Sequence, residues 1–388
     1  MKLLLVSPYH GGSHKAWAEG YQRFSRHQVK LLTLPGRYWK WRMHGGAITL
    51  ARRFNESRYE PDLIVATDML DLTTFLALSN GLRRPAPAFL FMHENQLTYP
   101  LPQDGSSGPM RRQLGERDSH YAFINFTSML AANQVFFNSE YHRRSFFREL
   151  RSFLKHFPDF KELTSLQTLR KKSRVLPVGV DLARLSQTSK SQSDLKKRTT
   201  VSTQQAPLIL WNQRWEYDKN PTKFFQVLYQ LEEENVNFRL AVCGQNFRRQ
   251  PTEFQQARKR LSNRIIHWGY ASEALYRKLL WQADVTVSTA DHEFFGVSMV
   301  EAMCCQVFPV LPAALSYPEL IPATLQEHCL YSNQDQLLGQ IRCALEQHEK
   351  TDEIARSLSR TMLRFDWSHL APEYDRQFNT KEVLIDTR

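Results

Sequence analysis

Two series of short apolar segments, separated by helical stretches, run along the 388-residue chain. Apolar runs of this length are typical of buried strands in a parallel sheet. The first series is Leu3–Val6, Leu63–Ala66, Ala88–Met92, Val135–Asn138 and Arg174–Val178. The second series is Leu208–Trp211, Phe238–Cys243, Ile265–Trp268, Val285–Ser288 and Val307–Leu311. With helices such as Phe224–Glu233 and Glu273–Gln282 between them, the strands predict an α/β fold with doubly wound sheets.

A polar segment, QTSKSQSDLKKRTTVSTQQ at Gln187–Gln205, separates the two series and is typical of a linker or disordered loop. A single hydrophobic core stops growing at roughly 250–300 residues, so we expect two domains. We predict a Rossmann-like domain over residues 1–186, the linker at 187–205 and a second Rossmann-like domain over 206–364. A C-terminal helix at about 365–388 is expected to pack back on the first domain. Such folds bind ligands at the carboxyl ends of their strands, which predicts a central cleft between the domains.

The N-terminal sequence MKLLLVSPYH has too short an apolar run for a signal peptide, and no stretch of ~18 apolar residues could span a membrane. No CxxC pair or His/Cys cluster suggests zinc, and the cysteine count is odd. We therefore expect a reduced, cytoplasmic protein without stable membrane insertion or structural zinc. The five cysteines are Cys243, Cys304, Cys305, Cys329 and Cys343.

The net charge of +12 is confined to the first half of the chain. Residues 1–180 contain 26 Lys and Arg against 14 Asp and Glu, whereas residues 181–388 contain 25 of each. This asymmetry is consistent with a polyanionic partner that docks on the first half, and equally with a solubilising surface.

Two motifs follow strands of the first series. In SPYHGGSH, Gly11 and Gly12 would let the backbone turn tightly and offer helix amides to a phosphate, although an ordinary βα turn has the same composition. His93, Glu94 and Asn95 follow AFLFM, where a histidine could contact a transferred sugar or stabilise developing charge. A lone histidine is more often structural, so only its placement favours this role. The motifs match neither GxGxxG, GxxxxGK[ST] nor HExxH.

The second series carries two further motifs. In WNQRWEYDKNP, Arg214 and Lys219 precede a helix that we expect to begin at Pro221, and two cations there can neutralise a leaving diphosphate. A single cation in a loop is usually just solvated. In DHEFFGVSMVEAM, Glu293 and Glu301 are separated by seven residues and suit the vicinal hydroxyls of a sugar or ribose. The apolar surroundings argue against chance surface charge, because an unpaired carboxylate there is costly. Amides at the helix start could hold phosphate oxygens.

Together these motifs resemble the retaining GT4 family of GT-B glycosyltransferases. GGSHK, LPGRYWKWR, FMHENQLTYP, WNQRWEYDKNP and TADHEFFGVSMVEAM resemble more specifically the tRNA-queuosine α-mannosyltransferase family, also described as glycosyltransferase-like domain-containing protein 1. The likeness runs from the first strand to Pro318–Glu319. Two departures from the GT4 pattern are Gln306 in EAMCCQVFP, where a glycine is common, and ALSYPE in place of GGxxE. Because of these departures, the pattern does not predict the packing around Glu319.

The resemblance implies a metal-independent, retaining hexosyltransferase that moves mannose from GDP-mannose to the cyclopentene diol of queuosine in a tRNA anticodon. His93 and Glu293 are the implied catalytic residues, Glu301 is implied to hold the ribose and Tyr270 to lie near the base. No cofactor is expected, since two cations and helix amides replace a metal ion. The implied donor contacts are Gly11, Gly12, Arg214, Lys219, Tyr270, Phe295, Gly296, Val297 and Glu301.

In GT-B enzymes the N-terminal half typically binds the acceptor, and here that half carries the positive charge. An anticodon loop is a polyanion with splayed bases, recognised by basic groups and aromatic stacking. The stretch RYWKWR supplies both, although Trp39 and Trp41 could equally be core residues. The expected acceptor contacts are Lys40, Trp41, Arg42, Glu94, Asn95 and, in a Gly/Ser-rich loop, Arg111, Arg112 and Arg117.

Two other functions stay open. The chain could be a GT4 transferase for a lipid or envelope polysaccharide, because HRRSFFRELRSFLKHF has apolar residues at helical spacing that could lie on an anionic membrane. We prefer a helix packed on the first sheet. The chain could also be a non-catalytic tRNA-binding protein on a GT-B scaffold, but that requires a broken donor site. The sequence alone does not fix the donor base or sugar, because these depend on few pocket contacts.

Overall fold

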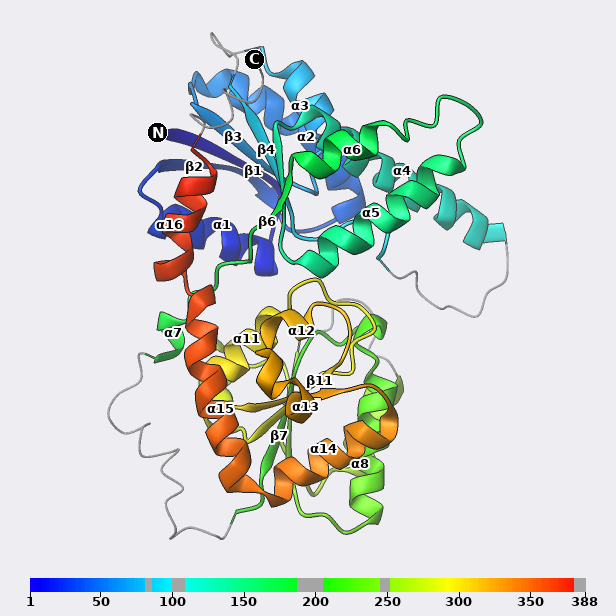
Figure 1. Cartoon of the computed structure of the whole chain (residues 1–388), viewed down its shortest axis with the longest axis vertical. Coiled ribbons are helices and arrows are strands. Elements are labelled where there is room, and N and C mark those ends of the chain that lie inside the picture. Colours follow the sequence, from blue (N-terminus) through cyan, green and yellow to red (C-terminus); the bar gives the residue numbers. More distant parts are fainter. Residues whose placement is uncertain (81–85, 100–108, 187–204, 245–251, 380–388) are drawn as a thin grey trace. The chain divides into compact units, whose positions relative to one another are not determined.

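The computed structural model describes residues 1–80, 86–99, 109–186, 205–244 and 252–379, and omits the side chains of 109–118, 186 and 348. The chain forms two compact units (Figure 1): unit 1 is Met1–Val180 with Trp367–Arg388, and unit 2 is Asp181–Asp366. The chain therefore passes from unit 1 to unit 2 after residue 180 and not after residue 186, because Asp181–Ser186 belongs to unit 2. Most of the expected linker lies outside the described residues, and the expected central cleft stays a prediction.

Unit 1 contains a parallel sheet in the order β2-β1-β3-β4-β5-β6 (Figure 1). Helices cover this sheet and supply its crossovers. The strands are β1 Lys2–His10, β2 Gln28–Pro35, β3 Leu63–Thr67, β4 Ala88–Met92, β5 Gln134–Phe137 and β6 Ser173–Val175. The helices are α1 Gly12–Phe24, α2 Trp39–Ser57, α3 Leu72–Leu78, α4 Pro109–Ala131, α5 Glu140–Lys155, α6 Ser165–Lys171 and α16 Trp367–Gln377.

The edge strand β2 is absent from the strands predicted from sequence. It pairs only with β1 along its length, from Lys2 opposite Gln28 to Ser7 opposite Thr33. Of its residues only Val29 and Leu34 are buried, because an edge strand has one exposed side. A search for continuous apolar runs finds strands buried on both faces and misses a half-exposed strand of this kind.

Unit 2 contains a second parallel sheet in the order β12-β11-β10-β7-β8-β9. Taken along the chain, this is the 3-2-1-4-5-6 order of the Rossmann fold. The strands are β7 Leu208–Asn212, β8 Arg239–Cys243, β9 Ile265–Gly269, β10 Val285–Val287, β11 Phe308–Pro312 and β12 Leu330–Tyr331. The α-helices are α7 Ala183–Ser186, α8 Pro221–Glu233, α9 Thr252–Arg260, α10 Glu273–Gln282, α11 Val297–Cys304, α12 Tyr317–Leu320, α13 Gln326–Cys329, α14 Gln334–Glu346 and α15 His348–Met362, with 3₁₀ turns η1 Tyr217–Lys219, η2 Ala323–Leu325 and η3 Leu363–Phe365.

The strand order of each sheet reverses direction at one point, and such switch points open the crevice where doubly wound sheets bind ligands. In unit 1 the reversal lies between β1 and β3, and in unit 2 between β7 and β10. The motifs with Gly11 and Gly12 and with Arg214 and Lys219 follow β1 and β7, and the Glu293 motif follows β10. The topology therefore places these segments at the binding edges of their sheets.

Helix α5 carries the amphipathic segment that could have suited a membrane. Its apolar residues Phe146, Phe147, Leu150 and Leu154 are buried in the core of unit 1 with residues of β5. The apolar face is therefore covered by the sheet, which confirms the preferred interpretation of this segment. Among the described residues, no helix is both long and apolar enough to cross a bilayer.

Both departures from the GT4 pattern occur where the backbone is left-handed. Gln306 has φ 61° and ends α11, with its own amide donating to the Met303 carbonyl (2.9 Å) and the next amide, of Val307, donating to Ala302 (3.1 Å). This is the Schellman arrangement, in which glycine is preferred. Leu315, at the first glycine position of GGxxE, also has φ 61°. The chain thus keeps the backbone shape of the pattern without its glycines.

Helix α16 packs on α1 and extends unit 1 after the chain has passed through unit 2 (Figure 1). The Trp17 indole donates to the Tyr374 hydroxyl (3.0 Å), and the Tyr21 hydroxyl donates to Asp375 (3.0 Å). Trp367 lies against Gly20 and Gly179, where an added Cβ would meet its ring at 2.0 and 2.5 Å. Glycine at both positions therefore makes room for the indole.

Replacing Trp367 by alanine should lower the free energy of unfolding by about 3–5 kcal/mol, because it empties a fully buried indole site. Urea titration followed by circular dichroism measures this loss. Trp41→Ala is the matched control, since Trp41 is 63% exposed, and it should change stability by less than about 0.5 kcal/mol. Equal losses in the two variants would contradict the packing described for α16.

Candidate active site

A buried ammonium group organises the binding edge of unit 2. Lys219 lies on η1 and is 5% exposed. Its Nζ lies 2.7 Å from the His292 carbonyl oxygen, 3.0 Å from Asp218 Oδ2 and 3.3 Å from Glu293 Oε2. An ammonium group has three N–H donors, so these three acceptors use all of them. In this structure Lys219 therefore holds the Glu293 loop, and direct contact with a diphosphate would require it to exchange one acceptor.

The loops that follow β7 and β10 are also joined by their backbones. The amide of Asp291 donates to the Asp218 carbonyl (2.9 Å), and the Thr289 hydroxyl donates to the Lys219 carbonyl (3.0 Å). The Ser316 hydroxyl donates to the Glu293 carbonyl at 3.3 Å. Glu293 is therefore fixed by its backbone as well as by its ion pair.

The charges around Glu293 decide its protonation. Burial acts to raise its pKa, but the nearby Lys219 and Arg214 outweigh burial, and the pKa lies below the usual value of 4.5. For Lys219 the balance is reciprocal: burial acts to lower its pKa, but Glu293 and Asp218 raise it above 10.5. The pair is therefore charged at neutral pH, with Glu293 as an acceptor of hydrogen bonds.

Arg214 is placed differently from Lys219. Its side chain is half exposed, and its Nη1 lies 3.3 Å from Glu216 Oε2. The sequence suggests that the two residues are an equivalent pair of cations, but in the structure their environments differ. Arg214 retains exposed guanidinium surface for an anion, whereas Lys219 is buried.

The N-terminal turn of α11 offers backbone amides. Gly296 has φ 93° and caps the helix, and the amides of Met299 (3.0 Å) and Val300 (3.1 Å) donate to its carbonyl. The amides of Val297 and Ser298 lie before these first helical hydrogen bonds, so they can bind an anion. The amide of Phe295 instead donates to Glu293 Oε1 (3.4 Å), so in this structure it is used within the protein.

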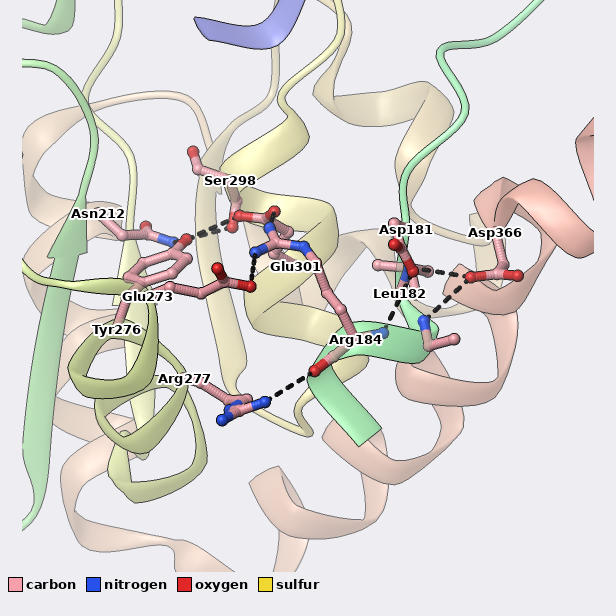
Figure 2. Close-up of polar contacts among 11 residues, drawn as sticks. Asp181, Leu182, Arg184, Asn212, Glu273, Tyr276, Arg277, Ser298, Glu301 and Asp366 are labelled. Atoms are coloured by element: carbon pink, nitrogen blue, oxygen red, sulfur yellow. Dashed lines mark hydrogen bonds and ion pairs between the residues drawn. The ribbon is translucent and has the colours of Figure 1, made fainter. Parts of the chain in front are cut away.

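Glu301 lies one turn further along α11, buried, and both of its carboxylate oxygens have protein partners (Figure 2). Oε1 pairs with the Arg184 guanidinium, and Oε2 accepts the Tyr276 hydroxyl at 2.8 Å. Asn212, at the end of β7, donates to the Tyr276 hydroxyl (3.1 Å) and to the Ser298 carbonyl (2.8 Å). Tyr270, expected near the base, is 74% exposed at the end of β9.

In unit 1 the two glycines after β1 are favoured for different reasons. Gly12 has φ 52° and nothing within 4 Å of an added Cβ, so its backbone conformation is what favours glycine. Gly11 lies against Gly36, and an added Cβ on Gly11 would come within 3.1 Å of the Gly36 Cα. Gly11 therefore lets the turn approach the end of β2.

His93 follows β4 and packs its ring among three aromatic side chains. Its centroid is 4.4 Å from that of His14, 4.6 Å from Trp17 and 4.8 Å from Phe91. Burial first, and then the neighbouring histidines His14 and His142, hold its pKa well below 6.5, so the ring is neutral at pH 7. No protein group among the described residues bonds its Nε2. That nitrogen is itself buried, so a ligand could form a hydrogen bond with it only on reaching the ring.

Buried polar side chains hold the turn that contains His93. The Asp68 carboxyl accepts the His93 amide (2.8 Å), Asn138 donates to the His93 carbonyl (2.9 Å), and Asn125 accepts the Gln96 amide (3.1 Å). Burial, and then the charge of Glu94, raise the pKa of Asp68 well above its usual value.

Asn95 and Glu94 have different environments in this turn. Asn95 is fully buried, and its Oδ1 accepts the amides of Leu97 and Thr98, both at 3.0 Å. Asn95 therefore holds the turn through Oδ1, and its expected contact with the acceptor stays a prediction. Glu94 is partly exposed and accepts a bond from Gln96 at 3.4 Å.

The RYWKWR stretch leads into α2 and exposes two aromatic rings. Tyr38 is 68% exposed at φ 56°, and Trp41 projects from the first turn of the helix. Trp39 is partly buried against Tyr121, and Lys40 lies 5.3 Å above the Trp39 ring. Trp39 is therefore largely a packing residue, whereas Trp41 remains available for stacking.

Arg42 and the three arginines of the expected loop complete the acceptor candidates. Arg42 Nε donates to the Pro35 carbonyl at 3.3 Å. The backbone at Arg111, Arg112 and Arg117 belongs to α4, so their assignment to a loop is wrong, and their side chains lie outside the described residues. Within the described part of the chain, no group of three metal-binding side chains occurs.

Several residues at these sites are missing from the sequence prediction. Asp68 could have been found, because it follows a buried strand at the switch point of unit 1. Asp218 and Tyr276 act through other residues and carry no motif of their own. Arg184 was not predicted as a site residue, because it lies just before the polar segment, in a stretch that the sequence assigns to the first domain.

Family models and curated relatives match most of this chain. The family model for the tRNA-queuosine alpha-mannosyltransferase N-terminal region matches residues 2–180, and the model for glycosyl transferases group 1 matches residues 192–358. A tRNA-queuosine alpha-mannosyltransferase of Drosophila melanogaster is 32% identical over 326 residues, which cover 82% of this chain and 81% of that protein. A GDP-mannose:cellobiosyl-diphosphopolyprenol alpha-mannosyltransferase of Xanthomonas oryzae pv. oryzae is 23% identical over 43% of this chain and 45% of its own.

Solved structures share the fold at low sequence identity. Anabaena HepE in complex with UDP and glucose is 17% identical with a TM-score of 0.66, covering 98% of this chain and 100% of that chain. Sucrose-phosphate synthase from Thermosynechococcus elongatus is 12% identical with a TM-score of 0.70 and full coverage of both chains. This likeness confirms the expected GT-B fold of two Rossmann-like units.

The Lys219–Glu293 pair predicts a specific acid sensitivity. Because the folded-state pKa of Glu293 lies below 4.5, its contribution to stability is complete above that pH and is lost as the pH falls through the folded pKa. Urea titrations from about pH 7 to about pH 3 should show a smaller loss of unfolding free energy for Glu293→Gln than for wild type, by up to about 1.4 kcal/mol per pH unit below about pH 4.5. Glu346→Gln, at an exposed position of α14, should retain the wild-type slope. An unchanged slope in Glu293→Gln would show that this carboxylate is not stabilised by charge.

Proposed function

Because the chain belongs to the tRNA-queuosine alpha-mannosyltransferase family, we propose that it transfers mannose from GDP-mannose to queuosine in tRNA, with retention of configuration. The observation that carries this proposal is the 32% identity to a curated member over 82% of the chain. A donor site in unit 2 is supported by the proximity there of Arg214, Lys219 and Glu293, the charged groups expected to bind a nucleotide sugar.

We assign the sugar to Glu293 and the diphosphate to Arg214 and the α11 amides. Glu293 is ionised and fixed, so it can accept hydrogen bonds from sugar hydroxyls without reorganising. Breaking the bond between the sugar carbon and the diphosphate oxygen leaves negative charge on the diphosphate. Arg214 and the amides of Val297 and Ser298 can stabilise that charge. Lys219 acts by holding Glu293 and by its positive charge.

In the proposed reaction an acceptor hydroxyl of queuosine forms the new bond to the sugar carbon, and its proton passes to the departing diphosphate. The neutral His93 ring can hold a sugar hydroxyl by a hydrogen bond through Nε2. We propose that donor binding needs no metal ion, because protein cations and helix amides supply the positive charge. Addition of a chelator should then leave the rate unchanged.

We propose that the acceptor tRNA binds unit 1 and that the reaction takes place in the cytoplasm. The charge excess of the chain lies in residues 1–180, and Trp41 and Tyr38 are exposed beside cationic residues. Exposed rings of this kind can stack on splayed bases. A lipid acceptor is less well supported, because the apolar face of α5 is buried in the core. The intact Arg214, Lys219, Glu293 and Glu301 set argues against a non-catalytic scaffold.

Glu293→Ala and Lys219→Ala should each abolish transfer of labelled mannose from GDP-mannose to queuosine-containing tRNA. The first loses the sugar contact, and the second leaves Glu293 and Asp218 buried without their cation. Gel-shift titration should show tRNA binding close to wild type for both. Wild-type turnover in either variant would remove that residue from the donor site.

Trp41→Ala and Arg42→Ala should weaken tRNA binding, by roughly fivefold or more for the stacking residue. Arg42→Ala should also lower the slope of the logarithm of affinity against the logarithm of salt concentration by about one unit. Arg258→Ala removes an exposed arginine of α9 in unit 2 and serves as the control. If Arg258→Ala weakened binding as much as Arg42→Ala, unit 1 would not be the principal tRNA surface.

A further inference from the structure

Arg184 lies outside every motif of the sequence, yet its backbone is held from several directions (Figure 2). Asp366 Oδ2 accepts the amides of Leu182 (2.9 Å) and Ala183 (3.2 Å), and Asp181 Oδ1 accepts the amide of Arg184 itself (3.2 Å). These bonds fix the start of α7 on unit 2.

Helix α10 holds the other end of the same segment. Arg277 Nη1 donates to the Arg184 carbonyl (3.3 Å), and the Trp281 indole donates to the Leu185 carbonyl (2.9 Å). Arg184 therefore starts from a fixed backbone position, so its guanidinium loses less conformational freedom when it makes a contact.

The guanidinium of Arg184 is placed on Glu301. One nitrogen, Nη2, pairs with Glu301 Oε1, and Nη1 lies 3.5 Å from Glu273 at the start of α10. Glu301 is buried, and a buried carboxylate without a cation is strongly destabilised. Arg184 is thus the cation that offsets the burial of the Glu301 carboxylate inside unit 2.

Tyr276 fixes the second oxygen of the same carboxylate. Burial, and then the charge of Glu301, raise the pKa of Tyr276 well above 10, so its hydroxyl remains a donor. Asn212 links this hydroxyl to the Ser298 carbonyl in the first turn of α11. The carboxylate is therefore coupled to the helix end that carries the phosphate-binding amides.

A carboxylate can accept about four hydrogen bonds, and Arg184 and Tyr276 use two. About two acceptor positions remain, which matches the two vicinal hydroxyls of a ribose. We propose that Arg184 is a positioning residue for the donor, which orients Glu301 so that its remaining lone pairs meet the 2′- and 3′-hydroxyls of the nucleotide. This inference rests on the proposed function, since it requires that Glu301 binds ribose.

The test measures nucleotide binding to the full chain by calorimetry. Wild type is first titrated with GDP and with UDP, and the nucleotide that binds more tightly is then compared with its 2′,3′-dideoxy form. The variants are Arg184→Gln, Arg184→Lys and Tyr276→Phe. The control is Arg342→Gln, which removes an arginine of similar exposure from an Arg–Glu pair between α14 and the end of α8. Thermal melting verifies that each variant is folded.

Arg184→Gln should weaken binding of the ribonucleotide roughly tenfold while leaving the dideoxynucleotide nearly unchanged, so that the preference for ribose collapses. Arg184→Lys should recover part of that preference, and Tyr276→Phe should lose a smaller part of it. The milder Tyr276→Phe keeps the test decisive if Arg184→Gln does not fold.

Three results would overturn the proposal. Unchanged affinity would show that Arg184 does not act on the donor, and equal losses for both nucleotides would indicate a purely structural role. Tighter binding would show that Arg184 blocks the ribose site. A preference of wild type for UDP would overturn the GDP assignment alone, and failure to bind either nucleotide would overturn both proposals.

Discussion

The candidate donor site depends on one buried ammonium group. Lys219 brings together the buried carboxylates of Asp218 and Glu293, whose burial without a cation would be strongly destabilising. Its three N–H donors join η1, which follows β7, to the loop that follows β10. The same contacts that stabilise these loops keep Glu293 ionised and oriented, so local stability and donor binding have one physical origin.

The strand order explains why such a pair can form. Strands β7 and β10 are neighbours in the sheet although more than seventy residues separate them in sequence, and the order reverses between them. Their carboxyl ends therefore bring distant motifs to one edge. Unit 1 repeats the arrangement, with the Gly12 turn after β1 and Asp68 after β3. Short apolar runs predict this architecture well, because a strand buried on both faces leaves a continuous signal. The half-exposed β2 leaves a weaker signal and escapes prediction.

Sequence reasoning singled out residues that the structure brings to one edge of unit 2, but not the contacts that they make there. The Glu293 and Lys219 motifs were recognisable, but only the structure shows that Lys219 uses all its donors on protein atoms. Asn95 was predicted to contact the acceptor, and only the structure shows that its Oδ1 also caps its own turn. Arg184 could not be predicted, because its contact with Glu301 crosses 117 positions of sequence and no local pattern encodes it. Partners that act through a second residue depend on tertiary packing, which short motifs do not record.

The central claim, mannose transfer to queuosine, is tested most directly by nucleoside mass spectrometry. The purified chain is incubated with queuosine-containing tRNA and separately with GDP-mannose, UDP-glucose and UDP-galactose, and the tRNA is digested to nucleosides. The account predicts that queuosine gains the mass of one hexosyl residue with GDP-mannose and that tRNA lacking queuosine gains none. Hexose on another nucleoside, or on queuosine only with a UDP-sugar, would contradict it.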